Sequence, residues 1–179
     1  MILFLTMALQ AAMPPAAPAA APLAPWTPRM KTDAATGLQS GSVSAASTEG
    51  KGRLVVRCDR RSDNVVSIQF IPSLPFAAAT PRPVSIQVDG APPLGANWDF
   101  PGSGTYVADD QIVTTLTTAI AHGKQIKVRV IDPMNNVVEA TIPGPASEAP
   151  IKQVVEACGY TFGQVPVRAP DKKPAAAAQ

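Results

Sequence analysis

The sequence contains a single histidine, His122, and only two cysteines, Cys58 and Cys158. Two thiols without a nearby histidine do not make a zinc site, and a lone histidine needs a partner before it can act in catalysis. The Gly-x-Ser-x-Gly elbow, the phosphate-binding loop and the dinucleotide fingerprint are all missing from the chain. We therefore expect no metal ion, no cofactor and no enzymatic activity.

Neither charge nor hydrophobicity is concentrated enough to indicate nucleic acid or a membrane as a partner. The net charge is +2, and the cations are spread among carboxylates, apart from the group Arg57, Arg60 and Arg61. That group is interpreted as the solvated end of a strand. The apolar run at 1–13 is shorter than the roughly 20 residues that span a bilayer. The sequence thus predicts no nucleic-acid binding and no stable membrane span.

The N-terminal apolar run is typical of the core of a secretory signal peptide, although no Lys or Arg precedes it. Ala19-Ala20-Ala21 offers the small residues after which signal peptidase cleaves. No cysteine lies near this site, so a lipoprotein anchor is not expected. We predict a signal peptide over 1–21, an Ala/Pro linker over 22–25, and a periplasmic or secreted location. The alternative is a disordered Ala/Pro tail with an incidental apolar start.

The two cysteines each lie on the apolar face of their own segment. Cys58 alternates with the apolar residues of a strand pattern, and Cys158 has helical spacing from Ile151, Val154 and Val155. Two inward thiols in an exported chain most often pair, so we predict the disulfide Cys58–Cys158. The alternative is two independent buried thiols that act as small apolar residues.

The disulfide and the composition together outline the domain organisation. The pair would close one unit, which we place at 26–160 as a single β-rich domain. The remainder, 161–179, finishes in Asp-Lys-Lys-Pro-Ala-Ala-Ala-Ala-Gln and is predicted to be a disordered tail.

Alternation of apolar and polar residues with period two dominates the domain. Clear strands are expected at 53–58, 66–70, 84–88 and 126–130, and weaker ones at 42–48, 104–108 and 137–142. Turn residues at 132–136 predict a hairpin between 124–131 and 137–142, whereas 72–83 is expected to be a long loop. One wet and one buried face per strand is typical of antiparallel sheets.

Two segments have helical patterns. Residues 110–122 could begin at a cap formed by Asp109 or Asp110 and end at Gly123. The same segment also alternates with period two, but its caps favour a helix. Residues 148–158 form the second predicted helix, with Ser147 as its cap and Gly159 as its end. The expected fold is α+β and mainly antiparallel β, a sheet or small sandwich with two packed helices.

Acidic and aromatic residues supply the remaining site candidates. Asp99, Asp109 and Asp110 could act as paired acids, but a helix cap and loop charges explain them more simply. A pocket lined by Asp99, Asp109 and His122 would instead indicate an unusual enzyme. His122 is better explained by the last turn of a helix, where the helix dipole favours a cation.

Four aromatic residues could anchor either a partner protein or the chain's own core. Trp98, Phe100 and Phe76 form a possible partner surface, because exposed aromatic rings are common interface anchors. The alternative for Trp98 is burial in the core beside a strand. Trp26 is expected to pin the start of the domain to the sheet.

The order of features resembles that of a known family. In sequence order these features are Trp26, the strands Leu54 to Cys58 and Ser67 to Phe70, Trp98, the helix 110–122, the strand Lys124 to Val130, Gly144, and Ala157-Cys158-Gly159. This order resembles small exported bacterial domains of the type VI secretion-associated VasI-like family and, more distantly, invasion-associated locus B proteins. The resemblance covers about 26–160, implies an accessory role in the envelope, and supplies no catalytic residues.

The functional expectation combines these observations. We expect a non-enzymatic exported bacterial protein, an accessory or adaptor that binds another envelope or secretion-system protein. The alternative is a secreted inhibitor of a hydrolase, which would need a rigid exposed loop such as 72–83 or 98–104.

Overall fold

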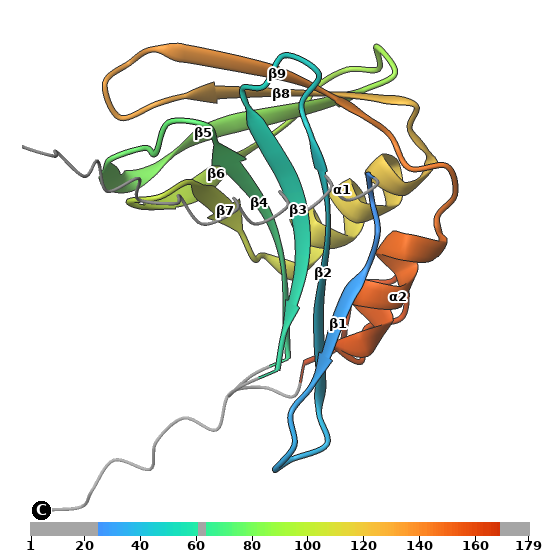
Figure 1. The fold of residues 1–179 in the computed structure, drawn as a ribbon. Coiled ribbons are helices and arrows are strands. Elements are labelled where there is room, and N and C mark those ends of the chain that lie inside the picture. Colours follow the sequence, from blue (N-terminus) through green and yellow to red (C-terminus); the bar gives the residue numbers. More distant parts are fainter. Residues whose placement is uncertain (1–24, 61–63, 169–179) are drawn as a thin grey trace, which may run out of the picture.

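The computed structural model describes residues 25–60 and 64–168, which form nine strands and two helices (Figure 1). The strands are β1 (Arg29–Thr32), β2 (Gln39–Ala46), β3 (Gly52–Asp59), β4 (Val65–Pro72), β5 (Ala78–Val88), β6 (Leu94–Pro101), β7 (Thr105–Val107), β8 (Gln125–Ile131) and β9 (Val137–Pro143). The helices are α1 (Asp110–His122) and α2 (Ala149–Ala157). The predicted signal peptide and Arg61 lie outside the described residues.

The nine strands form one antiparallel sheet in the order β1-β2-β3-β4-β7-β6-β5-β8-β9. Strands β1 to β4 follow one another as a meander. The chain then enters the sheet again at β5, and β6 and β7 lead back until β7 pairs with β4. Strands β8 and β9 extend the other side of β5. The prediction of an α+β fold that is mainly antiparallel β is confirmed.

The sheet curls until its two ends approach each other, with β8 and β9 at the top of Figure 1 above the upper ends of β2 and β3. The turn between β2 and β3 reaches β9, because Thr48 N donates to Thr141 O over 2.9 Å and Thr141 N donates to a Glu49 carboxylate oxygen over 3.0 Å. Trp26 is buried and joins both ends, since its backbone N–H bonds Ser44 O and its Nε1 bonds Pro143 O. The expected pinning role of Trp26 is confirmed.

Most predicted strands are present, with differences where proline or weak alternation misled the prediction. The loop expected at 72–83 is wrong in its second half, because β5 begins at Ala78 and contains Pro81 and Pro83. A register irregularity between Ala79 and Arg82 accommodates Pro81, because proline is tolerated at bulges, whereas Pro83 lies just beyond it and pairs with Asn97. Strands β1 and β6 were not predicted. The hairpin at 132–136 is confirmed, with the Asp132 carboxylate accepting bonds from Met134 N and Asn136 N.

Helix α1 begins and ends where its caps predicted. The Asp109 carboxylate accepts hydrogen bonds from Gln111 N and Ile112 N, and Gly123 follows the last turn. The period-two alternative for this segment is therefore wrong. Helix α2 is present, but the predicted Ser147 cap is wrong. The cap position is Glu148, whose backbone is already helical and whose side chain makes no capping bond.

The inner face of the sheet holds the core. Residues from β2, β3 and β4 alternate inward beneath the helices, and α2 packs on β2 and β3 while α1 packs on β4. The predicted disulfide is present between Cys58 of β3 and Cys158 at the end of α2, with the two Cα atoms 5.5 Å apart. The bond joins the sheet to the last helix.

The packed unit continues past the boundary expected at residue 160. Residues 161–168 are described, and Arg168 bonds the Asp110 carboxylate and the Tyr160 hydroxyl. Tyr160 in turn donates to Asp110 Oδ1 over 2.6 Å. The start predicted for the disordered tail, residue 161, is therefore too early.

Candidate functional site: a cationic groove on the open face of the sheet

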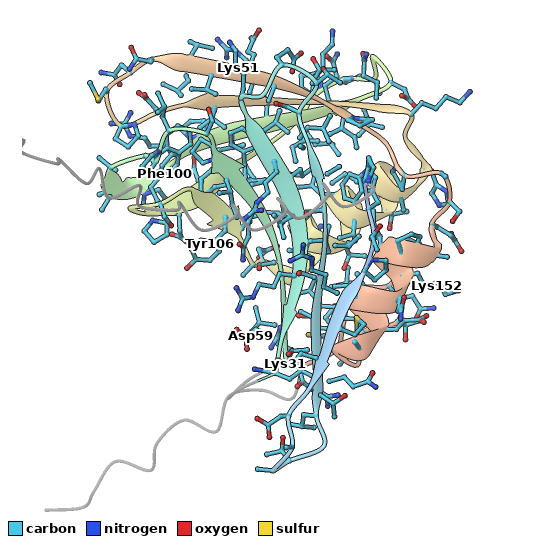
Figure 2. All side chains as sticks on the ribbon, viewed as in Figure 1. Lys31, Lys51, Asp59, Phe100, Tyr106 and Lys152 are labelled. Carbon is cyan, nitrogen blue, oxygen red and sulfur yellow. A yellow bond between two sulfur atoms is a disulfide. The ribbon has the colours of Figure 1, made fainter. Side chains whose placement is uncertain are left out.

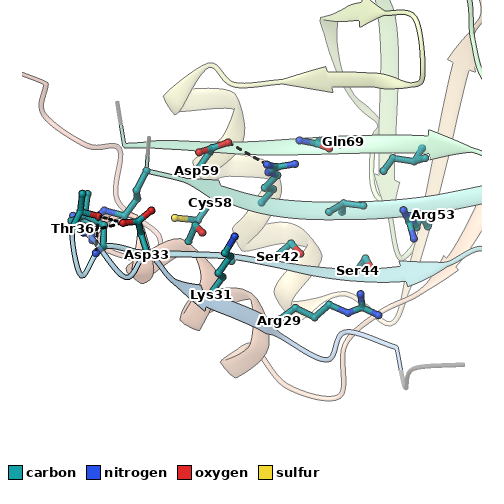
Figure 3. Close-up of a pocket in the computed structure, with 17 residues that line it drawn as sticks. Arg29, Lys31, Asp33, Thr36, Ser42, Ser44, Arg53, Cys58, Asp59 and Gln69 are labelled. Atoms are coloured by element: carbon teal, nitrogen blue, oxygen red, sulfur yellow. Dashed lines mark hydrogen bonds and ion pairs between the residues drawn. The ribbon is translucent and has the colours of Figure 1, made fainter. Parts of the chain in front are cut away.

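A groove of about 660 Å³ crosses the outer face of β1 to β4, the face turned away from the helices (Figure 3). Its long cationic side chains are Arg29, Lys31, Arg53, Arg57 and Arg60, and its small residues are Ser40, Gly41, Ser42 and Ser44. Figure 2 places Lys31 and Asp59 at the lower end of this face and Lys152 on the opposite, helix-bearing side. A volume of this size lies in the range of about 300–1,000 Å³ typical of ligand sites.

The groove follows from the residues that alternate along β2. Val43 and Ala45 point inward and are buried, so Ser40, Ser42 and Ser44 face outward. We call these three residues the serine track. Long side chains on both neighbouring strands rise beside it, because β1 carries Arg29 and Lys31 and β3 carries Arg53 and Arg57. Small residues between long ones leave a channel.

Strand pairing sets which cations face each other. The register pairs Arg29 with Ser42, and Ser42 with Arg57, so one serine has an arginine on each neighbouring strand. Two residues further along β2, Ser44 pairs with Val55, which is only 7% exposed. The groove is therefore cationic at Ser42 and apolar beside Ser44.

The carboxylates beside the groove already have partners. Asp59 forms an ion pair with Arg57 at 3.2 Å. Asp33 accepts bonds from Thr36 N–H and hydroxyl and from Ala35 N, and these bonds hold its pKa below the ordinary value. Among the described residues, no hydrogen bond or ion pair engages the side chains of three cations, namely Arg29, Lys31 and Arg53. Asp33 and Asp59 face five cations in the lining, so the described groove has a net positive charge, although Lys31 already interacts electrostatically with Asp33.

The arginine group seen in the sequence separates into different roles. Arg57 lies in the groove. Arg60 donates to Asn64 Oδ1 and to Ala157 O, and so connects the end of β3 to α2. The interpretation of the group as a solvated strand end is therefore wrong for Arg60, whereas Arg57 is exposed as expected.

The possible partner surface of Trp98, Phe100 and Phe76 is wrong, and the alternative for Trp98, burial in the core, is confirmed. Trp98, Phe100 and Phe76 are only 1%, 3% and 6% exposed. Phe76 packs against Phe100 with ring centroids 5.7 Å apart and against Phe70 at 6.4 Å. Trp98 and Phe100 share the inward face of β6, so they stabilise the core and present nothing to a partner.

The acidic residues and the histidine do not converge on the groove. Asp109 caps α1, and Asp110 is held by Arg168 and Tyr160. The Arg168 guanidinium lowers the pKa of Asp110, and burial raises the pKa of Tyr160. His122 lies 3.6 Å from Glu148, with its side chain 61% exposed. Asp99, Asp109 and His122 are all absent from the lining of the groove.

Residues 25–60 and 64–168 contain neither a cluster of metal ligands nor a membrane-spanning helix. No three His, Cys, Asp or Glu residues of this part of the chain lie close enough to hold a metal ion. Neither of the two described helices is long and apolar enough to cross a bilayer.

Comparison with known proteins shows one likeness, at the level of the fold. The crystal structure of invasion associated protein B from Bartonella henselae is similar over 74% of this chain and 94% of that protein, at 12% identity and a TM-score of 0.47. No family model and no curated protein matches the sequence. The resemblance to the VasI-like family is thus unsupported. The likeness to invasion associated protein B is consistent with the second resemblance and carries nothing about function.

The groove is what the sequence interpretation missed. Its signal was present as alternation in three places: the serine track, Arg29 with Lys31, and Arg53 with Arg57. Recognising it required knowing that β1, β2 and β3 are neighbours and that these residues share a face.

Proposed function

We propose that this protein is a non-enzymatic exported protein of the bacterial envelope that docks another envelope protein on the groove face of β1 to β4. The observation that carries the proposal is the groove itself, a hollow lined by cations on the face of the sheet that the helices leave open. A rigid sheet is a suitable platform, because side chains on strands are held more firmly than those on loops.

Export is supported by the disulfide and by the N-terminal sequence. Disulfides persist in oxidising compartments and are rare in the bacterial cytosol. The apolar run followed by small residues at 1–21 has the composition of a signal peptide.

A binding role is favoured over catalysis because the candidate catalytic groups already have structural roles. Asp109 stabilises the start of α1, Asp110 is paired with Arg168, and His122 faces Glu148. The inhibitor alternative has lost its motivation, because the aromatic residues of its two candidate loops are buried.

The proposal is tested by site-specific photo-crosslinking in cells that produce the protein. A crosslinking residue at Lys31, on the groove, is compared with one at Lys127, another exposed lysine, on β8 outside the groove. We expect an identified envelope protein to be captured from position 31 and not from 127, and the purified pair to bind in solution. Ser42→Trp, which fills the serine track, should abolish both capture and binding.

Two results would overturn the proposal. One is equal capture from positions 31 and 127, or capture that Ser42→Trp leaves intact. The other is turnover of a hydrolase substrate by the purified protein that His122→Ala or Asp110→Ala abolishes.

A further inference from the structure

We infer that the groove binds an extended acidic peptide segment, whose carboxylates lie over the cations that flank the serine track. This inference rests on the proposed function and deepens it by naming the chemistry of the partner. It is drawn from the width of the groove, the spacing of its cations and the charge that the described protein leaves unneutralised.

The width of the groove suits a single extended chain. The walls stand on β1 and β3, two strand spacings apart, or about 10 Å between backbones. Arg29 and Arg57 stand on these two walls, at the register positions on either side of Ser42. A strand-like peptide can lie along the track, whereas a nucleic-acid duplex cannot reach the small residues at its floor.

The spacing of the cations predicts the spacing of the acids. Along β1, Lys31 lies two residues from Arg29, toward one end of the groove. Along β3, Arg53 lies four residues from Arg57, toward the other end. Alternate residues of an extended peptide face the same way, about 6.8 Å apart. Carboxylates at positions i, i+2 and i+6 of the peptide would therefore meet Lys31, the Arg29–Arg57 pair and Arg53. Position i+4 would lie over Val55, so an apolar side chain fits there.

Hydrogen-bonding groups on the floor complement these charges. Among the described residues, no side-chain hydrogen bond involves the hydroxyls of the serine track. A carboxylate above Ser42 could accept from this hydroxyl and from two guanidinium groups. Bonds between ionised partners are roughly twice as strong as neutral ones.

The two terminal segments of the given sequence carry few acidic residues. The sequence of 1–24 contains no Asp or Glu, and 169–179 contains one, Asp171, followed by Lys172 and Lys173. Asp33 and Asp59, the two carboxylates on the groove, are engaged locally. A peptide rich in carboxylates would complement this charge.

The inference is tested with the purified, disulfide-bonded protein and the blocked peptide Glu-Thr-Glu-Thr-Val-Thr-Glu, with the Gln analogue as control. Binding is followed by NMR titration at low and physiological ionic strength. We expect saturable binding of the Glu peptide, with the shifts confined to β1 to β4. Binding should be at least about tenfold weaker for the Gln analogue, for Arg29→Glu and for Arg53→Glu, and it should weaken as salt screens the charges.

Lys127→Glu is the matched control, because it makes the same charge change on an exposed strand position outside the groove, and it should bind like the wild type. Equal binding of the Gln analogue, or tighter binding of duplex DNA or phosphatidylglycerol vesicles, would overturn the inference. The captured partner's docking could also be abolished by Ser42→Trp but unchanged by Arg29→Glu and Arg53→Glu. That result would overturn the inference and leave the proposed function standing. Absence of groove-specific capture would instead overturn the proposed function.

Discussion

Cys58 of β3 is bonded to Cys158 at the end of α2, and their Cα atoms lie 5.5 Å apart although 100 positions separate them in the chain. Both residues are buried, so the bond lies inside the packed unit. The bond fastens α2, the last helix, to the strand that also supplies Arg53 and Arg57 to the groove. The platform proposed for partner docking and the disulfide thus share one element.

Removing the disulfide should destabilise the protein without changing its fold. Cys58→Ala with Cys158→Ala is expected to lower the free energy of unfolding by about 2–5 kcal/mol, because a cross-link across a long loop restricts the unfolded chain. Urea denaturation measures the loss. A reductant should lower the midpoint of the wild type and leave that of the double variant unchanged. Two labelled thiols in the native exported protein, without reduction, would contradict the bond.

The pair formed by Asp110 and Arg168 should make stability depend on acid pH. The Arg168 guanidinium holds the pKa of Asp110 below its ordinary value of 3.8, so the folded state binds this proton less readily than the unfolded state. The resulting stabilisation is present above about pH 4 and is lost as pH falls through the folded pKa. Asp110→Asn should cost up to about 1 kcal/mol at pH 7, because Arg168 is half exposed.

Urea midpoints between pH 2.5 and 7 check this prediction. The difference between wild type and Asp110→Asn should shrink as the pH falls below 4. Asp99→Asn, which changes an exposed aspartate on β6, is the control and should follow the wild type throughout. A difference for Asp110→Asn that stayed constant across the whole range would show that the carboxylate charge contributes nothing.

Trp26 should stabilise the protein through two separable contributions. Trp26→Phe keeps a buried aromatic ring but removes the Nε1 donor to Pro143 O, and should cost about 1 kcal/mol. Trp26→Ala also leaves a cavity and should cost about 3–5 kcal/mol. Denaturation of both variants measures the two values. Equal losses for Phe and Ala would mean that the ring itself does not pack.

Local chemistry made several elements predictable from the sequence. The Asp109 cap and Gly123 mark the ends of α1, because capping involves groups only a few residues apart. The turn at 132–136 is equally local, since the Asp132 carboxylate bonds the backbone of its own turn. Ser147 does not cap α2. The segment that leads into α2 is instead held where Gly144 packs closely against the backbone of Gly123 and Lys124. A Cβ at Gly144 would lie 1.8 Å from Gly123 O, and Gly144 N bonds Lys124 O.

The aromatic residues show where local reasoning stops. Trp98 and Phe100 alternate with Asn97 and Asp99, which is a local sign of a buried strand face that the prediction did not use. No such pattern surrounds Phe76. Phe76 lies in the loop before β5, and its burial depends on Phe100 of β6 and Phe70 of β4. The segment that looked like an exposed loop therefore carries a core residue.

Taken by itself, the sequence determined the class of elements, the caps of α1, the turn at 132–136 and the pairing of Cys58 with Cys158. These depend on periodicity and on contacts between near neighbours, or on there being only two thiols to pair. The tertiary structure alone decided that Arg29, Arg53 and Arg57 surround one serine track on an open face. The reason is that neighbours across a sheet are set by strand order and register, which join residues far apart in the chain.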